Sequence, residues 1–268
     1  MPQEEDSQNL ARMFLGATRR IVETVAESSP AARDELSTKV VAMLGAVPVG
    51  GVTGDSSCRM MASAYESAGM LQIDGSKTFA KAIALLEPIA KPMWEDPATL
   101  AGSKDKQVLA VSYLRLLRLT GQIGQERGFL DKAMVPSAWG GRSLDVAIED
   151  IHVLFLEKKF GLAARKAKPL VEQMEKKLPV DVTQLAAADK AIIDRYMEVS
   201  TLQIQAFFGY GMANQDAPSL MRAAALLVDL EKRPWFRDSA GIWRRSLKDM
   251  QIQNADFLER CEKFRKGG

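Results

Sequence analysis

The sequence predicts an all-α protein built of stacked antiparallel helical hairpins. Apolar residues recur at intervals of three and four along most of the chain, which is the spacing of amphipathic helices. The segments with this spacing are short and are joined by loops of a few residues, which favours antiparallel packing of neighbours. Valine-rich stretches such as VPVGGV are interrupted by Pro and Gly, so we expect no strands.

The first two predicted helices form an amino-terminal hairpin over residues 1–45. In Asn9–Ala26, apolar residues recur on one helical face, with arginines between them. Ser29 precedes Pro30, a pair that is typical of a new helix start. The second helix is expected to end at Gly45.

The rest of the chain contains further helices of the same kind. Ser56 or Ser57 is expected to cap the next helix and Ser76 the one after it, whose end is marked by Pro92 and Pro97. The helices that follow are expected at about Asp105–Thr120, Gln125–Met134, Ser143–Lys159, Leu162–Lys177, Gln184–Gly211, Pro218–Glu231 and Ser239–Phe264.

Two stretches of the chain are similar to each other. AIALLEPIAKPMWED (82–96) and AAALLVDLEKRPWFRD (223–238) both have an Ala-rich helix with a Leu pair, followed by Lys, Pro, Trp and a final acidic residue. A third stretch, GLAARKAKPLVEQMEKKLP, ends at Pro179 in the same way. Such recurrence suggests stacked hairpins, in which each hairpin has an apolar face that only a neighbour can bury.

Around Phe207 the chain resembles a tetratricopeptide-type repeat. Phe207, Tyr210 and Gly211 fall where that family has the large, Leu-like and small residues of its first helix. The positions that match its second helix and closing proline are Ala223, Leu227, Leu230 and Pro234, and the small and aromatic pair of an earlier unit is Ala62 and Tyr65. Asn214 departs from the pattern, because the family has an aromatic residue there.

The resemblance covers Ser56 to Asp238 and implies a TPR-like α-solenoid, in which the first helix of each pair lines a concave groove. We therefore interpret residues 55–238 as a helical repeat array, residues 1–45 as the hairpin before it and residues 239–268 as a carboxy-terminal capping helix. We expect all three to belong to one continuous domain.

The glycine-rich stretch GAVPVGGVTGDSS, residues 45–57, has the composition of a phosphate-binding loop. Such a loop follows a strand and ends in Gly-Lys-Ser/Thr, whereas here a helix precedes it and Asp55 stands near the position of the lysine. We interpret the stretch as a linker, in which Gly45 ends one helix and Asp55, Ser56 or Ser57 caps the next.

Residues suited to metal binding or catalysis are few. His152 is the single histidine, and with Glu149 it makes one Glu-x-x-His pair where a diiron site needs two. Cys58 and Cys261 are neither clustered with each other nor near His152 in the sequence. No nucleophile motif accompanies a cysteine or serine, so we expect no catalytic, metal or cofactor-binding residues.

The composition limits the classes of partner that can be expected. Lys and Arg total 36 against 34 Asp and Glu, so there is no overall basic charge to attract nucleic acid or an anionic membrane. No apolar run is long enough to span a membrane, so we expect a soluble, cytoplasmic protein, with an exported protein that has lost its signal as the alternative. The segment Lys158–Lys177 is locally basic, and it either contacts phosphates or an acidic protein or is a solvated helix face.

The last predicted helix has apolar residues at alternating spacings of four and three, with one asparagine among them. This seam contains Trp243, Leu247, Met250, Asn254, Phe257, Cys261 and Phe264. One interpretation is a helix that caps the last hairpin, and the other is a coiled coil that joins copies of the chain into a homo-oligomer.

The function that the sequence favours is a protein–protein interaction scaffold that binds a peptide or protein partner in a concave groove. Arg115, Arg118, His152 and Gln203 are the candidate groove-facing residues, because each is a polar residue among apolar neighbours on a predicted first helix. The alternatives are an all-α enzyme with an unrecognised pocket and an oligomeric structural protein assembled through the carboxy-terminal helix.

Overall fold

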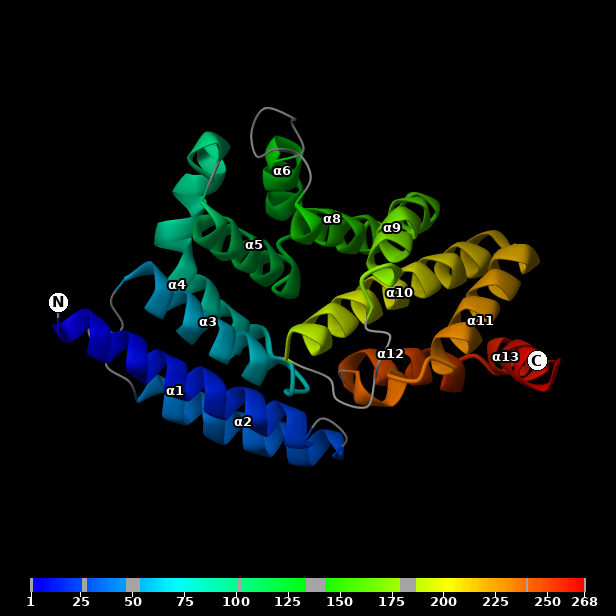
Figure 1. Ribbon diagram of the computed structural model, residues 1–268, viewed down its shortest axis with the longest axis horizontal. Helices are drawn as coiled ribbons and strands as arrows, with labels where there is room; N and C mark the ends of the chain where they lie inside the picture. The colour runs from blue at the N-terminus through cyan, green and yellow to red at the C-terminus, as the bar shows by residue number, and fades with distance from the viewer. Residues whose placement is uncertain are drawn as a thin grey trace. The chain divides into compact units, whose positions relative to one another are not determined.

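The computed structural model describes residues 2–25, 28–46, 54–100, 103–133, 143–178, 187–239 and 241–267. Over these residues the chain is all-helical, as predicted, and contains no strand (Figure 1). It forms two compact units, Met1–Glu149 and Asp150–Gly268, and the boundary between them falls within helix α8 (Leu144–Leu156).

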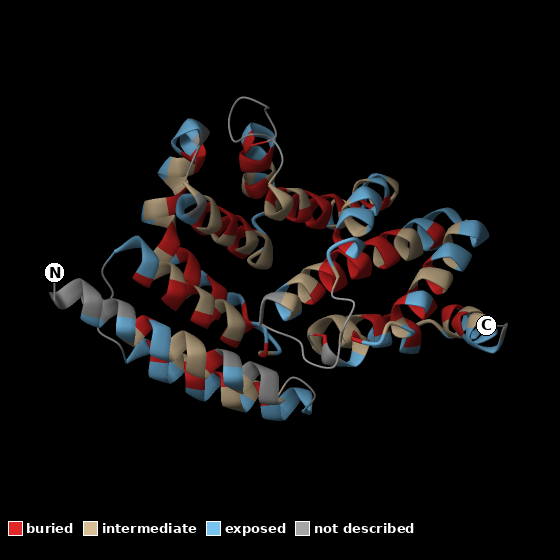
Figure 2. Ribbon diagram, in the orientation of Figure 1, coloured by how far each residue is buried: buried red, intermediate tan, exposed pale blue. Residues whose placement is uncertain are grey.

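The helices of the first unit pack in a row, with α1 and α2 both against α3. Helix α3 lies on α4, α4 lies on α5, and α5 lies on α6. Their bounds are α1 Pro2–Val25, α2 Pro30–Gly45, α3 Asp55–Gly69, α4 Ser76–Glu95, the 3₁₀ helix η2 Pro97–Leu100, α5 Lys104–Leu119 and α6 Ile123–Ala133. Figure 2 shows the buried face of each helix turned toward its neighbours.

Three helix starts test the capping predictions. Ser29 caps α2 as predicted, since its Oγ accepts a hydrogen bond from the Ala32 amide at 3.3 Å. The predicted caps of α3 and α4 are wrong, because these helices already begin at Asp55 and Ser76. The residue before α3 is Gly54, whose φ of 82° is favourable only for glycine. Because glycine has no side chain, this helix has no side-chain cap.

Pro92 does not end its helix, in contrast to the prediction, because α4 continues to Glu95. The next turn is held by Trp94, which is fully buried, donates from Nε1 to the Ala110 carbonyl at 3.0 Å and stacks on Phe129 at 5.9 Å. This packing offsets the hydrogen bond that a proline removes from a helix interior.

The two similar stretches of sequence therefore differ in structure at their Pro-Trp positions. Pro92 and Trp94 lie inside α4, whereas Pro234 and Trp235 follow the end of α11 (Ala217–Glu231). Trp235 is buried edge-on against Tyr196, with ring centroids 5.4 Å apart.

In the second unit, helix α10 (Ala187–Asn214) packs against α9, α11 and α12, and α13 packs against α11 and α12. The other bounds are α9 Phe160–Glu175, the 3₁₀ helix η3 Phe236–Asp238, α12 Gly241–Ile252 and α13 Ala255–Gly267. Small buried side chains lie on the helices that meet at α10: Ala163, Ala164, Ala167, Ala206, Ala223 and Ala224. Small residues of this kind allow helix axes to approach closely.

The predicted single helix over Ser239–Phe264 is wrong, because α12 ends at Ile252 and α13 begins at Ala255. The break has a local cause at Asn254. Its Nδ2 donates to the Met250 carbonyl at 3.0 Å, and its own carbonyl accepts from the Leu258 amide at 2.9 Å. An asparagine side chain that bonds to the backbone in this way competes with helix continuation.

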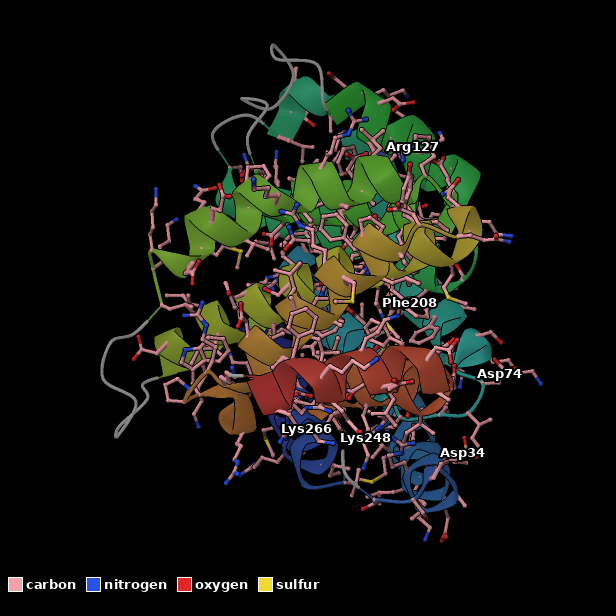
Figure 3. The ribbon with its side chains drawn as sticks, turned by 90° about the vertical axis from the view of Figure 1, so that its right-hand side faces the viewer. Asp34, Asp74, Arg127, Phe208, Lys248 and Lys266 are labelled. Atoms are coloured by element: carbon pink, nitrogen blue, oxygen red, sulfur yellow. The ribbon has the colours of Figure 1, made fainter. Side chains whose placement is uncertain are left out.

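Residues of the predicted heptad seam pack against other helices inside the second unit. Leu247, Met250, Phe257 and Cys261 are buried, Trp243 is half-buried, and the Phe257 ring meets that of Phe208 at 4.9 Å. Figure 3 labels Phe208 beside this helix pair, and Lys248 and Lys266 on its outer surface. The seam is thus interrupted at Asn254 and covered largely by helices of the same chain.

Among the helices that the structure describes, none is both long and apolar enough to cross a membrane.

Replacing Trp94 should test the packing that carries α4 past Pro92. We expect Trp94→Ala to lower the free energy of unfolding by about 3 to 5 kcal/mol, because it leaves a large cavity and removes the hydrogen bond to the Ala110 carbonyl. Trp94→Phe keeps the ring contact and should cost about 1 to 2 kcal/mol. Urea denaturation followed by circular dichroism measures both.

The control is Trp243→Ala at a half-buried position. Equal losses of unfolding free energy for Trp94→Ala and this control would contradict the role of Trp94 in holding the last turn of α4.

Candidate functional site

A groove follows helix α10 in the second unit, with α9 and α11 as its walls. It consists of two pockets of about 260 Å³ each, which are adjacent because Lys168 and Arg222 line both. We call it the α10 groove. Its floor residues on α10 are Tyr196, Ser200, Gln203, Ile204, Phe207 and Tyr210.

The floor follows from the helical repeat of α10, because its residues are separated by steps of one, three and four and share one helical face. Tyr196 and Tyr210 are the outermost of them, and a rise of about 1.5 Å per residue places them about 21 Å apart along the axis. An extended peptide advances about 3.3 Å per residue, so the groove has room for roughly six residues.

Gln203 is the most unusual residue of the floor. Its side chain lines the groove although the residue is only 4% exposed. Within the described part of the chain, its amide makes no hydrogen bond to the protein. A glutamine amide offers two donors and one acceptor, so Gln203 is suited to bind a ligand that supplies partners for them.

The two ends of the groove differ in charge. The end near Phe207 is lined by Arg165, Lys168 and Arg222, and by no acidic residue among those described. The end near Tyr196 also has acidic residues, and the charged side chains that line this second pocket are Lys168, Glu172, Glu175, Arg222, Asp229 and Arg233.

At the end near Tyr196, two of these side chains are already paired, since Arg233 forms a salt bridge with Glu175. Burial raises the pKa of Tyr196, and the negative charge of Glu175 raises it further. The Tyr196 hydroxyl therefore stays protonated at physiological pH, and its hydrogen bonds to Ser200 and Arg233 oppose the rise of its pKa.

Arg115 and Arg118 lie in the first unit, where both bind the same buried carboxylate. The Nε of Arg115 donates to Glu149 Oε1 at 3.1 Å, and the Nε of Arg118 donates to Glu149 Oε2 at 2.9 Å. Glu149 is completely buried. Their guanidinium groups hold a carboxylate of their own chain, and their expected contact with a partner stays a prediction.

Glu66 extends this cluster, since Arg115 Nη1 lies 3.5 Å from its Oε1. Burial raises the pKa of Glu66, and the positive charge of Arg115 opposes that rise. The cluster of two arginines and two glutamates joins α3, α5 and α8, so its role within the first unit is structural.

His152 lies in the second unit, and its Nε2 is 3.0 Å from Glu198 Oε1. The other oxygen of Glu198 accepts a hydrogen bond from Arg195 at 2.9 Å. His152 is not among the residues that line the α10 groove. Of the four candidates from the sequence, Gln203 is therefore the one that lies in this groove.

The described residues contain no group of three His, Cys, Asp or Glu side chains that could hold a metal ion. Most of the glycine-rich linker, residues 47–53, lies outside the part of the chain that is described.

Comparison of the chain with protein-family models, with curated proteins and with solved structures found no match. The geometry of the α10 groove is therefore the basis for the functional argument.

Removing both arginines of the buried cluster should destabilise the first unit. We expect the double variant Arg115→Ala, Arg118→Ala to lose about 3 to 5 kcal/mol of unfolding free energy, because Glu149 would lose both guanidinium partners while it stays buried. Urea denaturation at neutral pH measures the loss. As a control, Lys39→Ala removes an exposed pair with Glu35 and should leave the transition nearly unchanged. A wild-type-like transition for the double variant would refute the structural role.

The two cysteines should react slowly with thiol reagents in the native protein. Burial raises the pKa of Cys261 to about 11 and also raises the pKa of Cys58. Because the thiolate is the reactive form, labelling at pH 8 should be slow, should accelerate as the pH rises, and should become fast at both residues in urea. Mass spectrometry of labelled protein measures this, and rapid native labelling at pH 7 would contradict it.

Proposed function

We propose that this chain is a protein-interaction scaffold whose second unit binds an extended segment of a partner protein along the α10 groove. The observation that carries the proposal is Gln203, a residue only 4% exposed that lines the groove and whose amide forms no hydrogen bond with the described part of the chain. A peptide backbone offers one donor and one acceptor per residue, so it can satisfy both sides of a glutamine amide.

The walls of the groove support the same occupant. Val171 of α9 and Leu226 and Leu230 of α11 line it beside Ile204 of the floor. These side chains provide apolar surface next to the polar amide of Gln203. A site with apolar walls and a few placed polar groups suits a peptide whose side chains alternate between wall and solvent.

We further propose that the chain belongs to the TPR-like class of helical arrays. Support comes from Phe207 and Tyr210, the positions that resemble the first helix of a tetratricopeptide repeat, since both line the groove. Ala223 and Leu227, which match the second helix, are fully buried in the second unit. In this class the first helices line the binding surface, as α10 does here.

Selection of binding peptides tests the proposal. Random twelve-residue peptides displayed on phage would be selected on the full chain, and affinities of enriched peptides measured by fluorescence polarisation. We expect Gln203→Leu to weaken binding about tenfold, because the hydrogen bonds to the ligand backbone are lost. The same change should not lower the melting temperature, because the amide of Gln203 has no hydrogen bond to the described part of the chain that the change could remove.

The matched control is Gln205→Ala, since Gln205 is on the same helix but bonds to Ser246 Oγ at 2.7 Å and does not line the groove. It should leave peptide affinity unchanged. If no peptide is enriched, or if the affinity of enriched peptides is indifferent to Gln203→Leu, the proposed function is wrong.

A further inference from the structure

One end of the α10 groove has an excess of positive charge, which the described part of the chain neutralises in part through an ion pair at Lys168. Arg165 and Lys168 of α9 and Arg222 of α11 line this end, and no acidic residue does so. We call it the cationic end. Its other lining residues include the rings of Phe207 and Tyr210 and the side chain of Ser219.

The two arginines of the cationic end differ from five other arginines of the described chain. Arg115, Arg118, Arg195, Arg233 and Arg265 each contact a carboxylate. By contrast, Arg165 and Arg222 form no ion pair or hydrogen bond with any residue that the structure describes. The guanidinium of Arg222 lies over the Phe207 ring, 4.9 Å from its centroid, which holds it at the groove without neutralising it.

Two acidic side chains approach this end from outside it. Glu172 Oε1 lies 3.8 Å from Lys168 Nζ, one helical turn away on α9. Asp216 caps α11, where its Oδ2 accepts a hydrogen bond from the Ser219 amide at 3.1 Å. Neither carboxylate forms a salt bridge with Arg165 or Arg222, so both guanidinium groups remain available to an incoming anion.

We propose that the cationic end is a subsite for the carboxylate of an aspartate or glutamate side chain in the bound peptide, held by Arg165 and Arg222. This inference rests on the proposed function. The guanidinium groups come from the two opposite walls, α9 and α11, so an acidic side chain between them can contact both. Charge-assisted hydrogen bonds of this kind are the strong ones in protein recognition.

The position of the acidic residue in the peptide follows from the floor. Gln203 and Phe207 are four residues apart, which is about 6 Å along the axis of α10. An extended peptide covers this distance in about two residues. We therefore infer that the acidic residue lies two positions from the residue whose backbone contacts Gln203.

The opposite end of the groove argues for a peptide over a nucleic acid. Glu172, Glu175 and Asp229 line that end together with Lys168, Arg222 and Arg233, so its basic and acidic side chains are equal in number. A single-stranded nucleic acid carries a phosphate at every nucleotide, so one that filled the groove would place negative charge against these carboxylates. A peptide with one acidic residue at the cationic end meets no such repulsion.

The peptide selection described above also tests this inference. Peptides enriched on the wild-type chain should carry an Asp or Glu at one shared position. Arg165→Glu and Arg222→Glu should each weaken their binding about tenfold or more, and a peptide with Lys at that position should regain affinity for the Arg222→Glu variant. The control is Lys190→Glu, the same charge reversal at an exposed residue of α10 outside the groove, which should have little effect.

The outcomes separate the two proposals. Enriched peptides that need Gln203 but have no shared acidic residue, or that bind Arg165→Glu and Arg222→Glu as tightly as wild type, would overturn the subsite and leave the peptide groove intact. Failure to enrich any peptide would overturn both. Oligothymidine that competes with the enriched peptides at equal concentration would also overturn the acidic-peptide assignment. Circular dichroism melting of each variant confirms that it is folded.

Discussion

Close packing of small side chains around α10 is the constraint on which the second unit depends. The buried alanines of α9, α10 and α11 let these helices lie against one another without large side chains between them. Because both walls are held against α10 by such contacts, the remaining face of α10 becomes the floor of a groove. Larger side chains at these positions would separate the helices and open the core.

The helices themselves could be predicted from the sequence because their signal is local. The apolar repeat placed α5 and α11 within one or two residues of their observed bounds, Lys104–Leu119 and Ala217–Glu231. Errors arose where another interaction competes with that repeat. Tertiary packing of Trp94 carries α4 past Pro92, and the side chain of Asn254 divides the last predicted helix in two.

The candidate site was harder to predict because its contacts join distant parts of the sequence. The ion pairs of Arg115 and Arg118 with Glu149 could not be predicted. They join residues 34 and 31 positions apart, and no local sequence pattern indicates such a pairing. Arg165 and Lys168 were visible as part of a basic segment, whereas Arg222 had no such signal. Gln203 could be singled out because it is a polar residue within an apolar helix face.

The length of α10 has a consequence for how this protein can change during evolution. The helix runs without interruption for 28 residues, and each residue turns the chain by about 100°. Inserting or deleting a single residue before Gln203 would rotate the floor of the groove away from the preceding turns of the same helix. Substitutions in α10 can therefore change which ligands the groove binds, whereas changes in the length of α10 destroy the alignment of the floor. We therefore expect variation in length to occur in the connecting loops.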